Sequence, residues 1–131
     1  MKKNVIITAG PTNERIDSVM KITNMSTGAL GSIIAETLLE KKHNEIGTIY
    51  YVSTKMTRKP RIESDKLVYV TVESTQDLID ALRNIFSTHE IHIMIHSAAV
   101  GDYLGKYVIR AEDLIDEIFE TIQTATSKED I

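Results

Sequence analysis

Short apolar runs alternate along this chain with segments in which apolar residues recur every three or four positions. The short runs are rich in β-branched residues and end at turn-forming residues, a pattern typical of buried strands. Four strands are expected, at residues 4–9, 48–53, 67–72 and 91–97. The periodic segments predict amphipathic helices. One begins near Thr27 or Gly28, and the others cover residues 74–86 and 111–124.

Each helix has an expected apolar face. The first helix is expected to bury five aliphatic side chains, Leu30, Ile33, Ile34, Leu38 and Leu39. Lys41 and Lys42 follow them, where the carbonyl end of a helix favours cations. The second helix has a start signal at Ser74 to Asp77. The third presents Leu114, Ile115, Ile118, Phe119 and Ile122 together.

Alternating strands and helices predict an α/β domain with a mainly parallel sheet. With 131 residues, the chain has room for one modest domain, residues 1–131. Doubly wound domains usually have more than four strands, which leaves open a domain that is incomplete at its C-terminus. In such sheets, ligands bind beyond the carboxyl ends of the strands. Two loops that leave strand ends, 10–28 and 98–103, therefore become the candidate site.

Composition narrows the possible partners. A net charge of −4 and a pI of about 5.5 favour neither nucleic acid nor an anionic membrane. The chain has no cysteine, which excludes thiolate chemistry and suits a cytoplasmic protein. No apolar run approaches the ~18 residues of a membrane span. We therefore expect small-molecule partners, with any phosphate binding confined to a local site.

The loop at 10–28 has the composition of a polyphosphate-binding segment. Gly10 allows close backbone approach, and Ser26 and Thr27 offer hydroxyl and N–H groups just before a helix start. Gly28 and Gly31 are expected to leave room for a phosphate above and a strand below. A plain helix cap at Ser26 or Thr27 explains the same residues equally well. The spacing matches neither a Walker A loop nor the dinucleotide fingerprint.

Two other clusters of residues are weaker candidates for a functional site. His89, His92 and His96 lack metalloprotease spacing, and His92 and His96 fall on a predicted strand, so no metal site is expected there. His92, Met94 and His96 would share one strand face. The basic stretch at 55–66 lacks the interleaved aromatic residues of a nucleic-acid arm and is interpreted as a solvated loop.

Taken together, the motifs resemble the phosphopantothenoylcysteine synthetase family. They are Ile-Thr-Ala-Gly-Pro-Thr at 7–12, Glu14, Asp17, Ile-Thr-Asn at 22–24, Ser-Thr-Gly at 26–28, Gly31, and Ala-Ala-Val-Gly-Asp-Tyr at 98–103. Each motif alone is weak, but their order and spacing are specific. The resemblance covers residues 4–103, and the chain looks like the N-terminal portion of a longer ligase of the monofunctional bacterial type.

The resemblance implies a Rossmann-like three-layer fold, a homodimer, and a ligase that couples 4′-phosphopantothenate to cysteine through an acyl-cytidylate. CTP would be the co-substrate, with Mg²⁺. Asn24 would be the catalytic residue that handles the intermediate, and Lys21 would join it in substrate binding. The nucleotide would be bound by nine residues: Gly10, Pro11, Thr12, Ser26, Thr27, Gly28, Ala98, Ala99 and Asp102.

The sequence departs from the family pattern in two places. Met20 stands where the family often has arginine, and the adjacent Lys21 is a candidate replacement. A Lys-x-Lys-Lys segment that meets the triphosphate in the family has no counterpart at 105–131. A non-catalytic nucleotide-binding module therefore remains an alternative. A Rossmann-type NAD(P)-dependent oxidoreductase is a second alternative, which the glycine spacing disfavours.

Overall fold

The computed structural model of the protein describes residues 1–104 and 109–129. Its main sheet has four strands, all parallel, in the order β5-β4-β1-β6. They are β1 (Lys3–Ala9), β4 (Ile46–Ser53), β5 (Leu67–Thr71) and β6 (Ile93–His96). The four expected strands are thus confirmed, with ends that differ by one or two residues.

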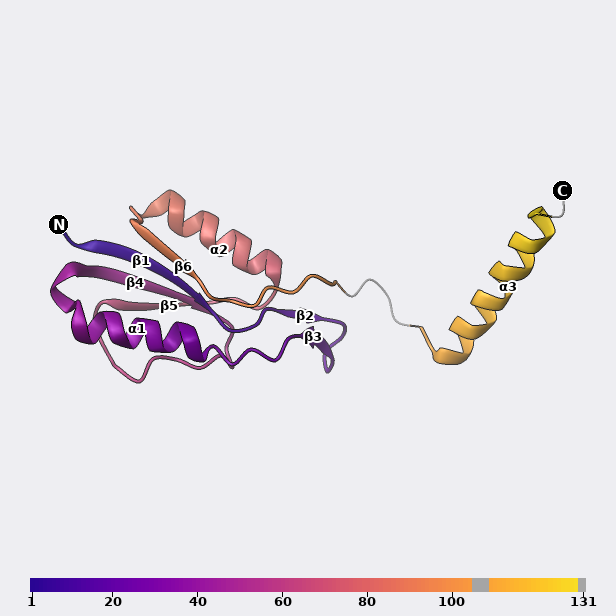
Figure 1. Ribbon diagram of the computed structural model, residues 1–131, viewed down its shortest axis with the longest axis horizontal. Helices are drawn as coiled ribbons and strands as arrows, with labels where there is room; N and C mark the ends of the chain where they lie inside the picture. The colour runs from indigo at the N-terminus through magenta and orange to yellow at the C-terminus, as the bar shows by residue number, and fades with distance from the viewer. Residues whose placement is uncertain (105–108, 130–131) are drawn as a thin grey trace.

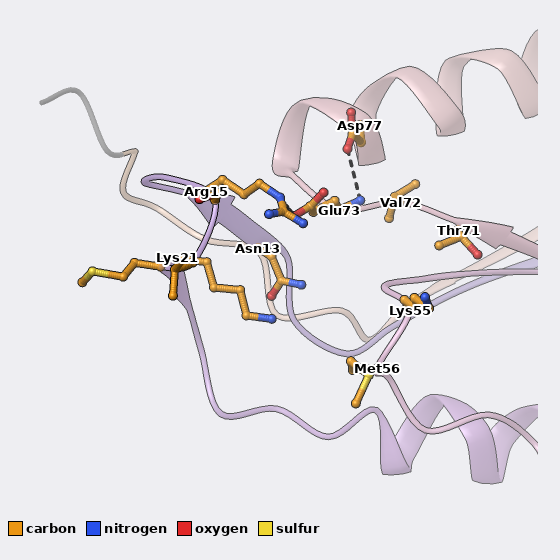
Figure 2. A pocket seen from close by; sticks show the side chains of 12 residues that line it. Asn13, Arg15, Lys21, Lys55, Met56, Thr71, Val72, Glu73 and Asp77 are labelled. Carbon is orange, nitrogen blue, oxygen red and sulfur yellow. Dashed lines mark hydrogen bonds and ion pairs between the residues drawn. The ribbon is translucent and has the colours of Figure 1, made fainter.

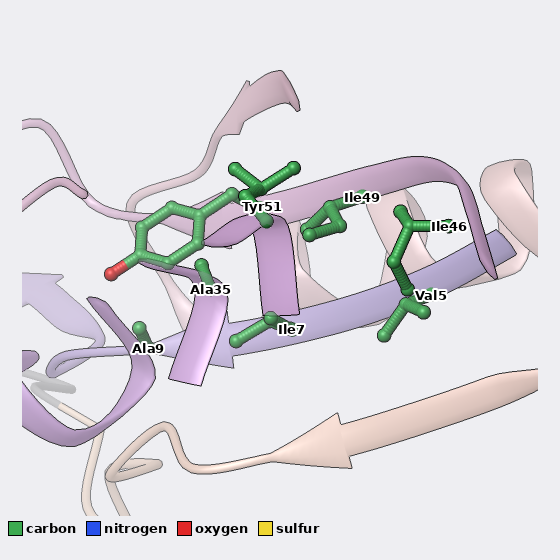
Figure 3. Close-up of a cluster of buried hydrophobic side chains, with 8 residues drawn as sticks. Val5, Ile7, Ala9, Ala35, Ile46, Ile49 and Tyr51 are labelled. Atoms are coloured by element: carbon green, nitrogen blue, oxygen red, sulfur yellow. The ribbon is translucent and has the colours of Figure 1, made fainter. Parts of the chain in front are cut away.

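Helices cover both faces of this sheet (Figure 1). On one face, Ala35 and Leu39 of α1 (Ala29–Lys41) pack with Val5 and Ile7 of β1 (Figure 3). On the other, α2 (Thr75–Thr88) contributes Leu78 and Ile85 to a cluster that contains Ile6. Successive strand residues point to opposite faces, so β1 supplies both cores. The predicted three-layer, Rossmann-like arrangement is confirmed.

The buried face of α1 differs from the expected one. Leu30 and Ile33 remain 64% and 49% exposed. Leu39 is buried as expected, and Ile34 and Leu38 pack against the core, but the rest of the buried side is formed by Gly31, Ser32 and Ala35. A β-carbon on Gly31 would lie 2.5 Å from the Ala9 Cβ, so the helix approaches β1 through its smallest residues. A count of large aliphatic residues misses such a face because close approach selects for small side chains.

The segment after β1 is more regular than expected. It contains an antiparallel hairpin of β2 (Asn13–Arg15) and β3 (Lys21–Thr23). Asp17 shapes its turn, because the carboxylate accepts hydrogen bonds from the N–H groups of Val19 at 2.8 Å and Met20 at 2.7 Å. These two bonds stabilise the charged form and hold the pKa of Asp17 below its usual value.

The remaining elements follow the sequence pattern. A 3₁₀ turn (His43–Glu45) joins α1 to β4. The Ser74 hydroxyl accepts the Asp77 N–H at 3.1 Å, and Asp77 in turn accepts the Ser74 N–H, which makes the start of α2 a capping box. The helix α3 (Ala111–Glu129) covers neither face of the sheet (Figure 1), and Ile115 and Phe119 are exposed on it. None of the helices in the described part of the chain has the length and apolar character to cross a membrane.

Candidate functional site

The strand order places a crevice beside β1. The chain passes from β1 to β4 and β5 on one side, and β6 then lies on the other side of β1. β1 and β6 thus flank a topological switch point in the strand order, and ligands bind at such points in open α/β sheets. A cavity of about 500 Å³ opens there, lined by residues 22–26 and 99–103. We call it the switch-point crevice.

Backbone hydrogen bonds hold the two walls of the crevice together. The Ala99 N–H donates to the Gly10 carbonyl at 2.8 Å, and the Thr12 N–H donates to the Ala99 carbonyl at 3.2 Å. Pro11 and Ala99 also form an isolated parallel β-bridge between the two loops. The buried Thr12 hydroxyl accepts the Gly101 N–H at 2.8 Å. The two loops therefore form one unit, although almost ninety residues separate them in sequence.

The Asn24 side chain links the loop that follows β6 to the segment that precedes α1. Its Nδ2 donates to the Ala99 carbonyl at 2.7 Å, and its Oδ1 accepts the Ser26 N–H at 3.2 Å. A side-chain amide has two N–H groups and two oxygen lone pairs. One donor and one acceptor of Asn24 thus remain available at the wall of the crevice, which Asn24 lines.

The start of α1 offers backbone donors. Gly28 precedes the helix in a left-handed conformation, with φ of 83° and no side-chain cap. The first helical bond runs from Ser32 N–H to the Gly28 carbonyl, so earlier N–H groups have no partner within the helix. The Thr27 hydroxyl accepts one of them, from Ala29, at 3.3 Å. Neither Ser26 nor Thr27 is the N-cap residue, so the plain-cap interpretation is wrong in that detail.

Thr57 fills the space in which side chains on Gly10 and Gly28 would lie. A β-carbon on Gly28 would lie 2.3 Å from Thr57 Cγ2, and one on Gly10 would lie 2.2 Å from Thr57 Oγ1. The missing side chain of Gly28 therefore leaves space for Thr57, and the expectation that Gly28 also leaves room for a phosphate stays a prediction. Gly31 does leave room for a strand, since it lies against Ala9.

The loop that carries Thr57 was missed by sequence reasoning. The Thr57 and Thr54 hydroxyls lie 2.7 Å apart in a buried pair, and the Arg58 N–H donates to the Thr27 carbonyl at 2.9 Å. Residues 54–58 thus pack against the segment that contains Gly10 and Gly28 and do not form a purely solvated basic segment. The surrounding lysines and arginines conceal this contact, and no local signal in the sequence marks Thr57.

The predicted site residues divide into three groups. Asn24, Ser26, Ala99 and Asp102 line the crevice. Gly10, Pro11, Thr12, Thr27, Gly28 and Ala98 lie next to it and shape it mainly through backbone contacts; the Ala98 N–H, for example, is 3.2 Å from Thr8 Oγ1. Lys21 does not line it but faces a separate cavity beyond the hairpin. The crevice lining contains no lysine or arginine among the described residues.

The strand histidines have structural partners. His92 Nδ1 accepts the Asn4 N–H at 3.0 Å, and His96 Nδ1 lies 2.6 Å from the Thr8 hydroxyl. Within the described ranges, no three His, Cys, Asp or Glu side chains are grouped closely enough to hold a metal ion.

The fold is that of a Rossmann-like α/β domain, with a crevice at the topological switch point. The chain belongs to a family of this class, since residues 1–113 match the model described as the DNA/pantothenate metabolism flavoprotein C-terminal domain. The resemblance found in the motifs is thereby confirmed at the level of the family.

Relatives and solved structures agree with this assignment. The coenzyme A biosynthesis bifunctional protein CoaBC of Vibrio vulnificus is 35% identical over 124 residues, which are 92% of this chain and 29% of that protein. The DNA/pantothenate metabolism flavoprotein of Streptococcus pneumoniae superposes with a TM-score of 0.68 at 36% identity, covering 78% of this chain and 42% of that one. The C-terminal domain of a CoaBC protein gives 0.65 at 36% identity, covering 81% and 50%. This chain thus spans less than a third of the CoaBC protein it matches.

Proposed function

We propose that this chain is the nucleotide-binding part of a ligase of coenzyme A biosynthesis, which joins 4′-phosphopantothenate to cysteine at the expense of CTP. Membership of the family and similarity to CoaBC support the pathway. The observation that carries the proposal is Asn24, whose amide joins Ala99 and Ser26 at the wall of one crevice. Two motifs that resemble those of the ligases thereby meet in one place.

The proposed reaction activates a carboxylate. An oxygen of the phosphopantothenate carboxylate attacks the α-phosphorus of CTP, and pyrophosphate leaves. The cysteine nitrogen then attacks the acyl carbon, which releases CMP and forms an amide. In such a reaction the protein contributes mainly by positioning the reactants and stabilising developing charge.

Each crevice residue has a role in this proposal. The free N–H of Asn24 would donate to the acyl-cytidylate, because an amide can bind it without adding charge. Gly10, Pro11 and Thr12, with Ala98 and Ala99, would line the nucleotide, and Asp102 would lie near the cytidine. Phosphate oxygens would accept from the donors of Ser26, Thr27 and Gly28, with the N–H groups that begin α1 adding a partial positive charge.

The switch-point crevice offers few protein ligands for a magnesium ion. Asp102 is the one carboxylate among the described lining residues. Mg²⁺ usually takes one or two carboxylates together with substrate phosphates. An ion here would therefore depend mainly on the triphosphate, where it would offset phosphate charge.

A turnover assay tests the proposal. The chain is mixed with CTP, Mg²⁺, phosphopantothenate and cysteine, and CMP and pyrophosphate are quantified. Asn24→Ala is expected to bind CTP while losing product formation, whereas Asn44→Ala, in the exposed 3₁₀ turn, is expected to retain it. Normal turnover by Asn24→Ala would refute the role of this residue.

A non-catalytic nucleotide-binding module is the second candidate. The crevice has no cationic side chain among its described lining residues, and a transferring phosphoryl group normally meets one. CTP binding without CMP release would support this candidate. An NADPH titration tests the alternative of an oxidoreductase, since neither the ligase nor the nucleotide-binding module is expected to bind NADPH. Sedimentation of the chain tests the proposed homodimer.

A further inference from the structure

The Thr8 hydroxyl anchors the segment that follows β6. Thr8 lies in β1 and is fully buried. Its Oγ1 lies 2.6 Å from His96 Nδ1 and accepts the Ala98 N–H at 3.2 Å. The backbone ladder between β1 and β6 ends at the pair of Thr8 and His96. A side chain, and not the backbone, therefore holds the Ala98 N–H where β6 leads into the wall of the switch-point crevice.

These two contacts determine where the protons lie. A backbone N–H can only donate, so Thr8 Oγ1 is the acceptor for Ala98 and keeps its own proton to donate. Among the described residues, His96 Nδ1 is the only other hydrogen-bond partner of Thr8 Oγ1. Both contacts are satisfied when the imidazole is neutral and carries its proton on Nε2.

Protonation of His96 removes that acceptor. Both nitrogens of an imidazolium carry a proton, so neither can accept the Thr8 hydroxyl. The hydroxyl proton would then be buried without an acceptor, which is costly. Relief requires the Thr8 side chain to turn or the ring to leave, and either movement weakens the anchor of the Ala98 N–H.

His96 is placed where it can take up a proton from solvent. It is the last residue of β6, an edge strand of the sheet, and its side chain is exposed. Histidine changes its charge between about pH 8 and about pH 5. The state of the contact with Thr8 therefore depends on pH within that range.

Few other charged or titratable groups lie on the elements around His96. Strand alternation places the ring on the face of the sheet that α2 covers. Asp77 of α2 is engaged in capping that helix, where its carboxylate also accepts the Glu73 N–H (Figure 2). In the part of the chain that the structure describes, only Thr8 forms a hydrogen bond or ion pair with the ring. The groups on these elements are Lys3 on β1; Asp77, Asp80 and Arg83 on α2; and Glu90, His92, Asp102 and Tyr103 in the segments that flank β6.

The position of Ala98 bears on the crevice through the next residue. The Ala99 N–H donates to the Gly10 carbonyl at 2.8 Å. The Ala99 carbonyl accepts the Thr12 N–H at 3.2 Å and the Asn24 Nδ2 at 2.7 Å. A shift at Ala98 thus moves the carbonyl that holds the Asn24 amide in place.

We propose that Thr8 and His96 are positioning residues for the switch-point crevice, and that protonation of His96 releases the Ala98 end of its wall. With neutral His96, the Asn24 amide is held at the wall; with protonated His96, it is not. The consequence for turnover rests on the proposed ligase function, whereas the consequence for the wall does not.

Amide hydrogen exchange of the whole chain, followed by NMR at several pH values, tests the effect on the wall. Rates are expressed as protection factors, which correct for the intrinsic pH dependence of exchange, and the ring signals of His96 report its protonation. Protonation of the ring is expected to lower the protection of the Ala98 amide about tenfold, the scale of one hydrogen bond. The Ser97 amide, which donates to the Thr8 backbone carbonyl at 3.1 Å, should keep its protection and is the internal control.

His96→Asn separates the proton from the geometry. Asparagine offers an amide oxygen as acceptor in place of Nδ1, and it does not titrate. This variant should keep the Ala98 amide protected at every pH, while His43→Asn, at an exposed position of the 3₁₀ turn, should follow the parent chain. Thr8→Val should lower the protection at every pH, whereas Thr8→Ser keeps the hydroxyl and should retain the parent profile.

Three results would overturn the proposal. The first is an Ala98 protection factor that stays constant while the His96 ring titrates. The second is the parent profile in His96→Asn, which would place the responding group elsewhere, for example at His92. The third is an equal loss of protection at Ser97, which would mean that the end of β6 opens as a whole.

Turnover at the same pH values tests the consequence for the reaction. The ratio of kcat for the parent chain to kcat for His96→Asn is expected to fall about tenfold as His96 takes up its proton, again the scale of one hydrogen bond. A constant ratio would refute this consequence. Absence of turnover at every pH would count against the proposed ligase and leave the exchange result standing, so the two proposals fail separately.

Discussion

Thr57 occupies the space that a side chain on Gly28 would need. The missing β-carbon would lie 2.3 Å from Thr57 Cγ2 but no closer than 3.4 Å to its next neighbour, the backbone nitrogen of Gly10. One methyl group therefore accounts for most of the steric conflict. The remaining constraint on Gly28 is its φ of 83°.

Gly28→Ala is expected to destabilise the fold by roughly 2–5 kcal/mol, the sum of overpacking and a left-handed alanine. Thr57→Ser removes the conflicting methyl group and keeps the hydroxyl that pairs with Thr54. The double variant should therefore regain the overpacking part of the loss. Urea denaturation of the single and double variants measures this coupling.

Gly10→Ala tests whether Thr57→Ser also relieves a clash that involves a different atom of Thr57. Its β-carbon would meet the Thr57 hydroxyl oxygen at 2.2 Å, an atom that Thr57→Ser retains. Thr57→Ser is therefore expected to leave Gly10→Ala unrescued. Equal rescue of both glycine variants would show that the loop at 54–58 shifts as a whole.

Thr12→Val should loosen the wall of the switch-point crevice. Valine has nearly the shape of threonine but cannot accept the Gly101 N–H, which the Thr12 hydroxyl accepts at 2.8 Å. We expect a loss of stability of about 1–3 kcal/mol and faster amide hydrogen exchange at Gly101. Thr12→Ser keeps the acceptor and should protect the Gly101 amide nearly as well as the parent chain does.

Glu14 is expected to be needed for stability. This buried carboxylate accepts the Thr75 N–H at 2.8 Å, at the first residue of α2. Glu14→Ala removes the acceptor and should cost about 1–3 kcal/mol in the free energy of unfolding. Glu63→Ala, on an exposed loop position, is the control and should change stability by less than about 0.5 kcal/mol.

Tyr51 should make the protein sensitive to alkali. Burial, with smaller contributions from Tyr69 and Glu36, raises the pKa of Tyr51 to about 12. An unfolded tyrosine ionises near 10, so the unfolded chain loses this proton first. The stability that the neutral phenol contributes is thus fully present below pH 10 and falls as pH rises toward 12.

Tyr51→Phe removes that titration together with the hydrogen bond to the Arg58 carbonyl, 2.8 Å away. It should be less stable at pH 7 by about 1 kcal/mol and should lose less stability between pH 10 and 12. Thermal unfolding at several pH values measures both effects. Tyr103→Phe, at an exposed position, should follow the parent chain throughout.

Much of the main scaffold could be predicted without coordinates. The runs that became β1, β4, β5 and β6 contain β-branched residues and stop at turn signals, both of which are local properties. The capping box at Ser74 and Asp77 is local in the same sense. The hairpin within residues 10–28 was not predicted, because strands of three residues are too short for a periodic signal.

The candidate site was predicted only in part. The motifs indicated Asn24 and Asp102, and both line the switch-point crevice. They placed Lys21 with Asn24, whereas the hairpin turns the two toward different cavities. Side chains alternate between the faces of a strand, so a separation of three residues across a strand end does not imply a shared site.

The amino-acid sequence by itself determined where this chain forms the four strands of its main sheet and its helices, because periodicity, caps and turn residues act over a few residues. The tertiary structure alone decided that Thr57 fills the space beside Gly10 and Gly28, that Asn24 joins Ala99, and that Asn13 lies buried without a partner for its oxygen. These contacts connect residues brought together by the order of parallel strands, and no local pattern records that order.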